Sequence, residues 1–324
     1  MFGRMKGLEL IVKTCMGVKP GQQVLIITDD YARSIKISQQ VAELCDLEGA
    51  EPVIAIMEPR THYGHEPPRA ITEAMQVVDM IFYVAETYDI THTDAAKRAR
   101  EKGIKSVLSI AHISEDYFQR EITIDDLNTI KERTERLADI ASRAEEARII
   151  SPHGTDIGLS LKGREGLPLH PLSEGALIVV PDYAEVAISP VEGSTEGVLV
   201  VDASVQGWNF LLREPLKLTI KSGRITEVSG PGEYVERLKK SLATDENASN
   251  CAAELGIGTS HTIPKELMGG VWDYGMSGTI HIAAGRNNDI GGETFSQIHI
   301  DFLLTSATVW LDDLCVLENG ELKV

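Results

Sequence analysis

The first half of the chain alternates between short apolar runs and segments whose apolar residues recur at helical spacing. Apolar runs that are joined by single helices are typical of a parallel sheet covered on both faces. A charged helical pattern follows the last run and completes this part of the chain. The sequence therefore predicts an α/β parallel-sheet domain over residues 1–148. In chain order the expected strands and helices are 24–29, 32–47, 52–57, 69–77, 80–85, 93–102, 105–111 and 125–146.

The second half of the chain has a different pattern, in which polar and apolar residues alternate along strands that are joined by hairpin turns. Two of these turns are marked by Ser222-Gly223 and Asn319-Gly320, and such pairs favour tight two-residue hairpins. One helix is expected at 233–243. The sequence thus predicts a β-rich domain over residues 149–324 that is mainly antiparallel and curled or barrel-like.

One expected strand, FSQIHIDFLL at residues 295–304, carries two polar residues within an apolar run. Successive side chains of a strand point to opposite faces, so His299 and Asp301 share one face. Ile298, Ile300 and Phe302 share the other. The polar face is therefore either open to water or holds a ligand.

Polar residues within apolar runs recur at three other places in the second half, at Glu185, at Glu254 and at His281. Each one alone is best explained as the solvent face of a half-buried strand. Four such places together favour a common site. Two histidines and three carboxylates can hold one or two divalent ions. Two ions that share bridging carboxylates would activate a water and polarise a carbonyl, as in aminopeptidases.

Overall charge and composition narrow the range of partners. The 324 residues include 49 acidic and 31 basic ones, with a formal net charge of -18. This charge disfavours nucleic acid and anionic membranes and favours a small molecule or a short peptide as substrate.

The N-terminal segment is amphipathic and predicts a first helix without a signal-peptide cleavage site, so we expect a cytoplasmic protein. The four cysteines lack CxxC spacing and are expected to be buried thiols.

The motifs of the second half resemble one known family of enzymes. In order, AEVAISPVEGSTEGVLVVD, KSGRITEV, AELGIGTS, GTIHIAAG and GGETFSQIHIDF look like the metallo-aminopeptidase family that includes aminopeptidases T and S. The resemblance covers essentially the whole chain and implies a homodimer with an α/β domain and a β-rich catalytic domain. It also implies that a pair of metal ions, for which zinc, cobalt and manganese are the candidates, is bound by Glu185, Glu254, His281, His299 and Asp301.

The primary hypothesis from this resemblance is a hydrolase that removes N-terminal residues from peptides by means of a metal-activated water. Glu185 and Glu254 are expected to serve in catalysis as well as in metal binding. Arg286 either steadies developing negative charge or neutralises nearby carboxylates. A non-enzymatic binding protein on the same fold is disfavoured, because buried polar groups without a ligand are costly.

Two departures from the aminopeptidase pattern support an alternative function. The family usually has a tyrosine shortly after the residue matching His281, and this chain has none there. The segment between His281 and His299 is also short. A related and similarly compact branch, the 2,5-dihydroxypyridine dioxygenases, binds one iron and opens a nitrogen heterocycle with oxygen. His281, His299 and Asp301 fit the two-histidine, one-carboxylate formula of such iron sites, but that branch lacks carboxylates matching Glu185 and Glu254.

Other polar residues are weaker candidates. Isolated histidines near strand ends, where open α/β sheets bind ligands, are usually solvated. A histidine seven residues after Glu254 is either an acid–base group or a surface residue, and Glu293 flanks the expected metal strands. The histidines concerned are His62, His65, His92, His112 and His261.

Overall fold

The computed structural model describes residues 6–62, 64–86, 90–107, 120–251 and 253–324. The chain divides into two compact units, one formed by Met1–Lys131 and Leu169–Asp182 and the other by Glu132–Pro168 and Tyr183–Val324. The chain therefore crosses between the units more often than the single boundary expected near residue 148. Two contacts explain the difference. The C-terminal part of the helix α5 (Ile124–Arg143) packs into the β-rich core, and β8 (Leu177–Ile178) returns to pair with the parallel sheet.

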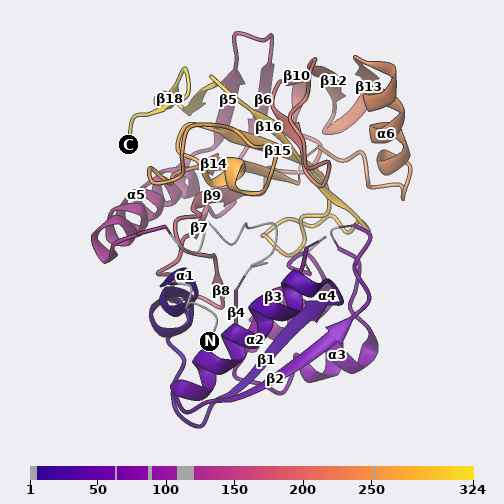
Figure 1. Cartoon of the computed structure of the whole chain (residues 1–324). Coiled ribbons are helices and arrows are strands. Elements are labelled where there is room, and N and C mark those ends of the chain that lie inside the picture. The colour runs from indigo at the N-terminus through magenta and orange to yellow at the C-terminus, as the bar shows by residue number, and fades with distance from the viewer. Residues whose placement is uncertain (1–5, 63, 87–89, 108–119, 252) are drawn as a thin grey trace. The chain divides into compact units, whose positions relative to one another are not determined.

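The first unit contains a five-stranded sheet in the order β2-β1-β3-β4-β8, and its strand pairs are parallel. The predicted α/β parallel-sheet domain is confirmed (Figure 1). The predicted strand at 105–111 is observed over Lys105–Val107, and residues 108–111 and His112 lie outside the described residues. The remaining elements of this unit are α1 (Lys6–Leu10), the π-helix η1 (Ile11–Cys15), β1 (Gln23–Asp29), α2 (Ala32–Leu47), β2 (Glu51–Met57), α3 (Arg69–Ala74), β3 (Met80–Val84), α4 (Asp94–Glu101) and β4 (Lys105–Val107).

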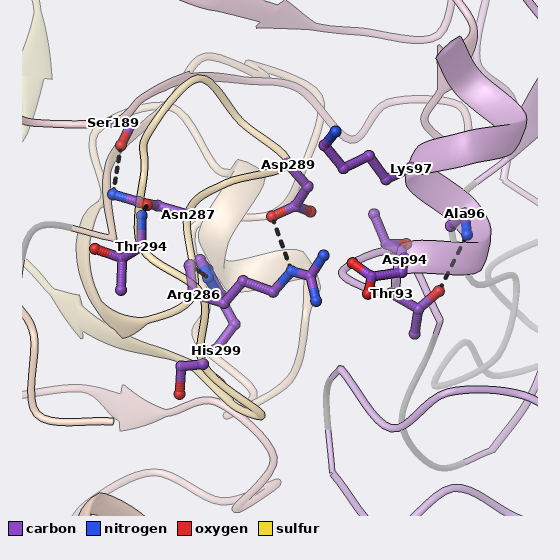
Figure 2. A network of polar contacts seen from close by, with 12 residues as sticks. Thr93, Asp94, Ala96, Lys97, Ser189, Arg286, Asn287, Asp289, Thr294 and His299 are labelled. Carbon is purple, nitrogen blue, oxygen red and sulfur yellow. Dashed lines mark hydrogen bonds and ion pairs between the residues drawn. The ribbon is translucent and has the colours of Figure 1, made fainter. Parts of the chain in front are cut away.

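Local signals in the sequence explain where these elements begin and end. Helix α4 starts after Thr93, whose side chain accepts a hydrogen bond from the Ala96 N–H at 3.2 Å (Figure 2). Helix α2 is followed by Gly49 with φ +81°, a conformation that favours glycine. Pro52 lies in β2, which is an edge strand, and a proline without an N–H is tolerated at such an edge.

The second unit contains two antiparallel sheets. Their strand orders are β13-β12-β10-β6-β5-β17-β18-β19 and β11-β16-β15-β14-β9-β7. The elements are β5 (Glu146–Ile150), β6 (Asp156–Ser160), β7 (Leu167–Leu169), β9 (Glu185–Ile188), β10 (Glu196–Val201), β11 (Ser204–Val205), β12 (Leu216–Lys221), β13 (Arg224–Ser229), α6 (Gly232–Leu242), β14 (Glu254–Gly258), α7 (Trp272–Gly275), β15 (Ile280–Gly285), β16 (His299–Leu304), β17 (Thr308–Leu311), β18 (Leu314–Glu318) and β19 (Glu321–Leu322).

The two sheets of this unit bury one common hydrophobic core. Leu199 and Leu218 from the eight-stranded sheet join Ile282 and Phe302 from the six-stranded sheet, and Leu137 of α5 belongs to the same cluster. The barrel-like closure expected from the sequence is therefore wrong. Each sheet buries its apolar face against the other sheet and keeps its two edge strands, so closure is not needed to cover that face.

The predicted hairpin turns are confirmed. Ser222 and Gly223 have φ of +47° and +70°, and Asn319 and Gly320 have φ of +49° and +79°. Two consecutive positive φ angles match the tight turns that follow the twist of antiparallel strands. Among the described helices, none is long and apolar enough to cross a membrane.

The core between the two sheets gives a direct stability test. Phe302 is fully buried, and we expect Phe302→Ala to lower the free energy of unfolding by about 3–5 kcal/mol because a cavity remains. Urea unfolding measures this change. Leu314→Ala, at a side chain that is 47% exposed in the same unit, is the control and should have a much smaller effect. Equal losses in the two variants would contradict the assignment of this core.

Candidate metal centre

The polar residues singled out in the sequence lie on one face of the six-stranded sheet. In β16, Phe302 and Leu304 point into the core, so His299 and Asp301 point to the opposite face. In β15, Ile280 and Ile282 likewise point into the core and place His281 on that opposite face. Glu185 of β9 and Glu254 of β14 alternate with core residues in the same way. The expected alternation is confirmed over residues 299–302, and Ile298 lies before the start of the strand.

The strand register then brings these side chains together. Ala283 is paired with Asp301 on one side and with Glu254 on the other. His281 is opposite Gly256, and Glu185 is opposite Gly258. Glycine and alanine therefore occupy the positions between the polar residues, which leaves room for the longer side chains to converge.

The five predicted ligands converge in one cluster. The Glu254 carboxylate lies between two imidazoles, with Oε1 3.3 Å from His281 Nε2 and Oε2 3.4 Å from His299 Nε2. Asp301 Oδ1 is 3.0 Å from His299 Nε2, and Glu185 Oε2 is 3.7 Å from His281 Nε2. Two groups of three donors, Glu185/Glu254/His281 and Glu254/His299/Asp301, each have ligand atoms within 4.8 Å of one another.

Burial makes this cluster a suitable place for a cation. Each of the five residues is at most 6% exposed, so the face is not open to water. Glu185 Oε2 accepts no hydrogen bond from the described residues. Buried carboxylates are costly unless they are paired or coordinate a metal, and imidazole with carboxylate suits zinc, manganese and iron. The donor set therefore fits one or two divalent ions.

Electrostatics in the metal-free site favour protons at the positions that a cation would take. Burial opposes the charge of His281, but Asp301, Glu185 and Glu254 together raise its pKa to about 9. Burial raises the pKa of Glu185 to about 8. Glu254 behaves differently, because hydrogen bonds from His281 and His299 outweigh burial and hold its pKa well below the usual range. A divalent ion at this site would have to displace protons from both His281 and Glu185.

Two tyrosines at the site were not predicted from the sequence. Tyr183 is hydrogen bonded to Glu185, and burial raises the pKa of Tyr183 well above its usual value. The Tyr274 ring meets His281 edge-on, with ring centroids 5.3 Å apart, and its hydroxyl is 3.4 Å from Ser204 Oγ. The two-residue spacing of Tyr183 from Glu185 is a signal that could have identified it. Tyr274 comes from the short helix α7, whose sequence gives no such signal.

His299 is oriented by the backbone of the segment that follows β15. Its Nδ1 lies 2.7 Å from the Arg286 carbonyl oxygen, so Nδ1–H donates there and Nε2 faces the carboxylates. Hydrogen bonds of this kind fix the tautomer of metal-binding histidines. The Arg286 side chain is buried, with Nε 3.5 Å from Asp289 Oδ1 (Figure 2) and the guanidinium 5.2 Å from the Phe295 ring centroid. A catalytic role for Arg286 stays a prediction.

The weaker candidates that lie among the described residues are not part of this cluster. His62 and His65 stack on each other with centroids 5.1 Å apart, and His261 is exposed. Glu293 contributes its backbone N–H to Glu192. Neither of the donor groups found in the described ranges contains any of these residues or His92.

Comparison with known proteins identifies the family. The NicX family, described as 2,5-dihydroxypyridine 5,6-dioxygenase, matches residues 9–324. The chain belongs to the NicX family. This enzyme family is the branch that was predicted as the alternative, and the aminopeptidase family expected first is only partly supported. Comparison with curated protein sequences gives no match.

Two solved structures share the fold of this NicX-family chain. The 2,5-dihydroxypyridine dioxygenase from Pseudomonas putida KT2440 is 18% identical, with a TM-score of 0.82 over 98% of this chain and 96% of that chain. Wild-type AmpT from Thermus thermophilus is 16% identical, with a TM-score of 0.71 over 99% of this chain and 98% of that chain. At these identities the likeness shows the fold, and the fold predicted from the sequence agrees with both.

Gly256 provides a test of the geometry of the cluster. A Cβ atom added there would lie 1.9 Å from His281 Cε1, so Gly256→Ala must displace the imidazole. Since a misplaced ligand weakens coordination, we expect zinc affinity, measured by competition with a chromophoric chelator, to fall about 10- to 100-fold. Gly158→Ala is the control, because Gly158 also lies in a strand but a Cβ there meets nothing within 4 Å. Unchanged affinity in Gly256→Ala would contradict the placement of His281.

The raised pKa values predict how the metal-free protein responds to pH. A folded-state pKa of about 9 for His281, above its usual 6.5, means that the folded state holds a proton which the unfolded state loses first. Stability therefore falls as pH rises from about 6.5 to 9. The Glu185 pKa of about 8, raised from 4.5, acts in the same direction.

Thermal unfolding of chelator-treated protein at pH 6.5 and pH 9 measures this effect. We expect a lower midpoint at pH 9 and a larger rise on adding zinc there, because fewer protons compete with the metal. His281→Gln should reduce the difference between the two pH values. A midpoint that rises with pH in the metal-free protein would be inconsistent with these pKa shifts.

Proposed function

We propose that this chain is a non-haem iron dioxygenase that opens the ring of a hydroxylated nitrogen heterocycle. The observation that carries the proposal is the pair of buried imidazoles, His281 and His299, whose Nε2 atoms both face the carboxylate cluster that includes Asp301. Membership of the NicX family supports this reaction class. The substrate class follows the family description and remains part of the proposal.

His281, His299 and Asp301 would hold the iron in this proposal. Two histidines and one carboxylate leave coordination positions open, which is the arrangement of non-haem iron oxygenases. When bound, the iron would allow dioxygen and the ring to react at one place. In such a reaction a ring carbon–carbon bond breaks, both oxygen atoms enter the product, and the substrate supplies the electrons.

The remaining side chains would handle protons and orientation. Burial raises the pKa of Glu185 to about 8 in the metal-free site. A bound cation would displace that proton, and the freed carboxylate could then take a proton from a ring hydroxyl. Tyr183 is hydrogen bonded to Glu185 and orients it. Glu254 contacts both imidazoles and keeps the two rings in place. The burial of all five residues limits the access of water.

A specific observation favours a second candidate, a metallo-hydrolase of the aminopeptidase type. The two donor groups Glu185/Glu254/His281 and Glu254/His299/Asp301 share Glu254, and a shared carboxylate is the usual bridge between two catalytic ions. The dioxygenase needs one ion and the hydrolase needs two. The number of ions per chain therefore separates the two functions.

Metal content and oxygen uptake together test the proposed function. Protein purified under argon and reconstituted with Fe(II) should bind about one iron per chain and consume about one dioxygen per dihydroxypyridine opened. His299→Ala should lose activity by about 1000-fold or more, because an open iron site depends on each of its three ligands. Asp313→Ala, at an exposed acidic residue, is the control. About two zinc or cobalt ions per chain, with release of amino acids from aminoacyl amides and no oxygen uptake, would support the hydrolase instead.

Glu185→Gln distinguishes the same two functions by a separate route. In the dioxygenase, Glu185 moves a proton, so the variant should keep one iron per chain and lose most of its turnover. In the hydrolase, Glu185 is a ligand, so the variant should lose one of two ions. Elemental analysis of the variant, together with its kcat, decides between these outcomes.

A further inference from the structure

The loop that connects β15 to β16, residues 286–298, is organised around one buried side chain, Asn287. Its Nδ2 donates to Ser189 Oγ and to Glu192 Oε1, both at 2.9 Å. Its Oδ1 accepts the Thr294 N–H at 2.7 Å. Figure 2 shows Asn287 directed toward Ser189, with Thr294 beside it. Both amide N–H groups and the carbonyl oxygen of this side chain are therefore used.

Glu192 fixes the far side of the same loop. Its Oε1 also accepts the Glu293 N–H at 2.8 Å, and its Oε2 is paired with Arg164. Arg164 in turn donates to the Gly291 carbonyl oxygen at 2.6 Å. Burial opposes the charge of Glu192, but the bonds from Glu293 and Asn287 and the charge of Arg164 hold its pKa below the usual value. Glu192 is thus an anion at neutral pH and a strong acceptor.

The backbone of the loop is shaped to enclose the Asn287 carboxamide. A Cβ atom at Gly292 would lie 2.1 Å from Asn287 Cγ, so only glycine fits beside this side chain. The backbone carbonyl of Asn287 accepts the Gly292 N–H at 2.9 Å and the Ile290 N–H at 3.1 Å. The backbone and the side chain of Asn287 are therefore both held by the loop.

The position of Asn287 connects this loop to the metal centre. The residue before it, Arg286, presents the carbonyl oxygen that lies 2.7 Å from His299 Nδ1. The same residue closes the base of the loop, where the Arg286 N–H donates to the Ile298 carbonyl at 2.8 Å. On the other side, Ser189 directly follows β9, the strand that begins with Glu185. Asn287 therefore ties together segments that carry Glu185 and His299.

We propose that Asn287, held by Glu192 and Ser189, is a positioning residue of the metal centre. It fixes the Arg286 carbonyl so that His299 keeps its proton on Nδ1 and presents Nε2 to the metal. The inference rests on the proposed metal-dependent function, but it concerns residues outside the ligand set. Loss of such outer contacts usually costs about 10- to 100-fold in metal affinity.

The test compares four variants with the wild type in two measurements. The first is zinc affinity, and the second is the exchange rate of the His299 Nδ1–H in the metal-free protein by nuclear magnetic resonance, assigned with His299→Gln. Asn287→Ala should exchange this proton at least about 10-fold faster and bind zinc about 10- to 100-fold more weakly. Asn247→Ala is the matched control, because Asn247 donates to the Phe295 carbonyl of the same loop at 2.9 Å without touching Asn287. It should match the wild type in both measurements.

A compensating pair of substitutions distinguishes a positioning role of Asn287 from a simple loss of folding. Asn287→Asp alone places a carboxylate against Glu192 and should weaken zinc binding as much as Asn287→Ala. Adding Glu192→Gln removes the repulsion between the two carboxylates, so the double variant should recover part of the affinity and of the slow exchange of the proton. A merely structural role for Asn287 would not produce this recovery.

The outcomes separate the inference from the proposed function. Wild-type affinity and exchange in Asn287→Ala would overturn the inference, and so would a double variant no better than Asn287→Asp. If the wild type binds no metal, the proposed function fails. The exchange rate of the His299 Nδ1–H still decides whether Asn287 positions that ring.

Discussion

The second unit depends on one physical constraint, which is that five ionisable side chains share a buried face of a single sheet. Three carboxylates and two imidazoles at most 6% exposed are stable only when protons or a cation lie between them. In the metal-free protein, the protons on His281 and Glu185 meet this need. Two small residues between the ligand positions, Gly256 and Ala283, leave room for the cluster. The hydrophobic core on the opposite face of the sheet holds the strands in register.

Much of this arrangement could be predicted from the sequence because it follows from the two-residue period of a strand. His299 and Asp301 share a face for that reason, and the apolar runs of the first half predicted the parallel sheet. Features that depend on distant pairing could not be predicted in this way. Asn287 contacts Ser189 and Glu192, which are 98 and 95 residues away in the chain. Local alternation also says nothing about sheet edges, so an open pair of sheets and a barrel look alike in the sequence.

The family match bears on the reaction class, and the geometry of the metal centre bears on the number of ions. The NicX match supports oxygen-dependent ring opening as the reaction class, whereas the shared Glu254 in two donor groups allows two ions as well as one. Both readings use the same buried face, so they differ in the number and identity of ions and in whether Glu185 holds a metal or a proton. The orientation of His299 by the Arg286 carbonyl is required in either case, because a ring that turns away removes its Nε2 from the cluster.

The most direct test of the account is anomalous X-ray diffraction from crystals of the metal-loaded protein, collected on both sides of the absorption edge of the metal. We expect a strong anomalous peak in contact with His281 Nε2, His299 Nε2 and Asp301, with the His299 Nδ1 still bonded to the Arg286 carbonyl. A peak elsewhere in the molecule, or no peak at this face at full metal occupancy in solution, would contradict the claim that these residues form a metal centre.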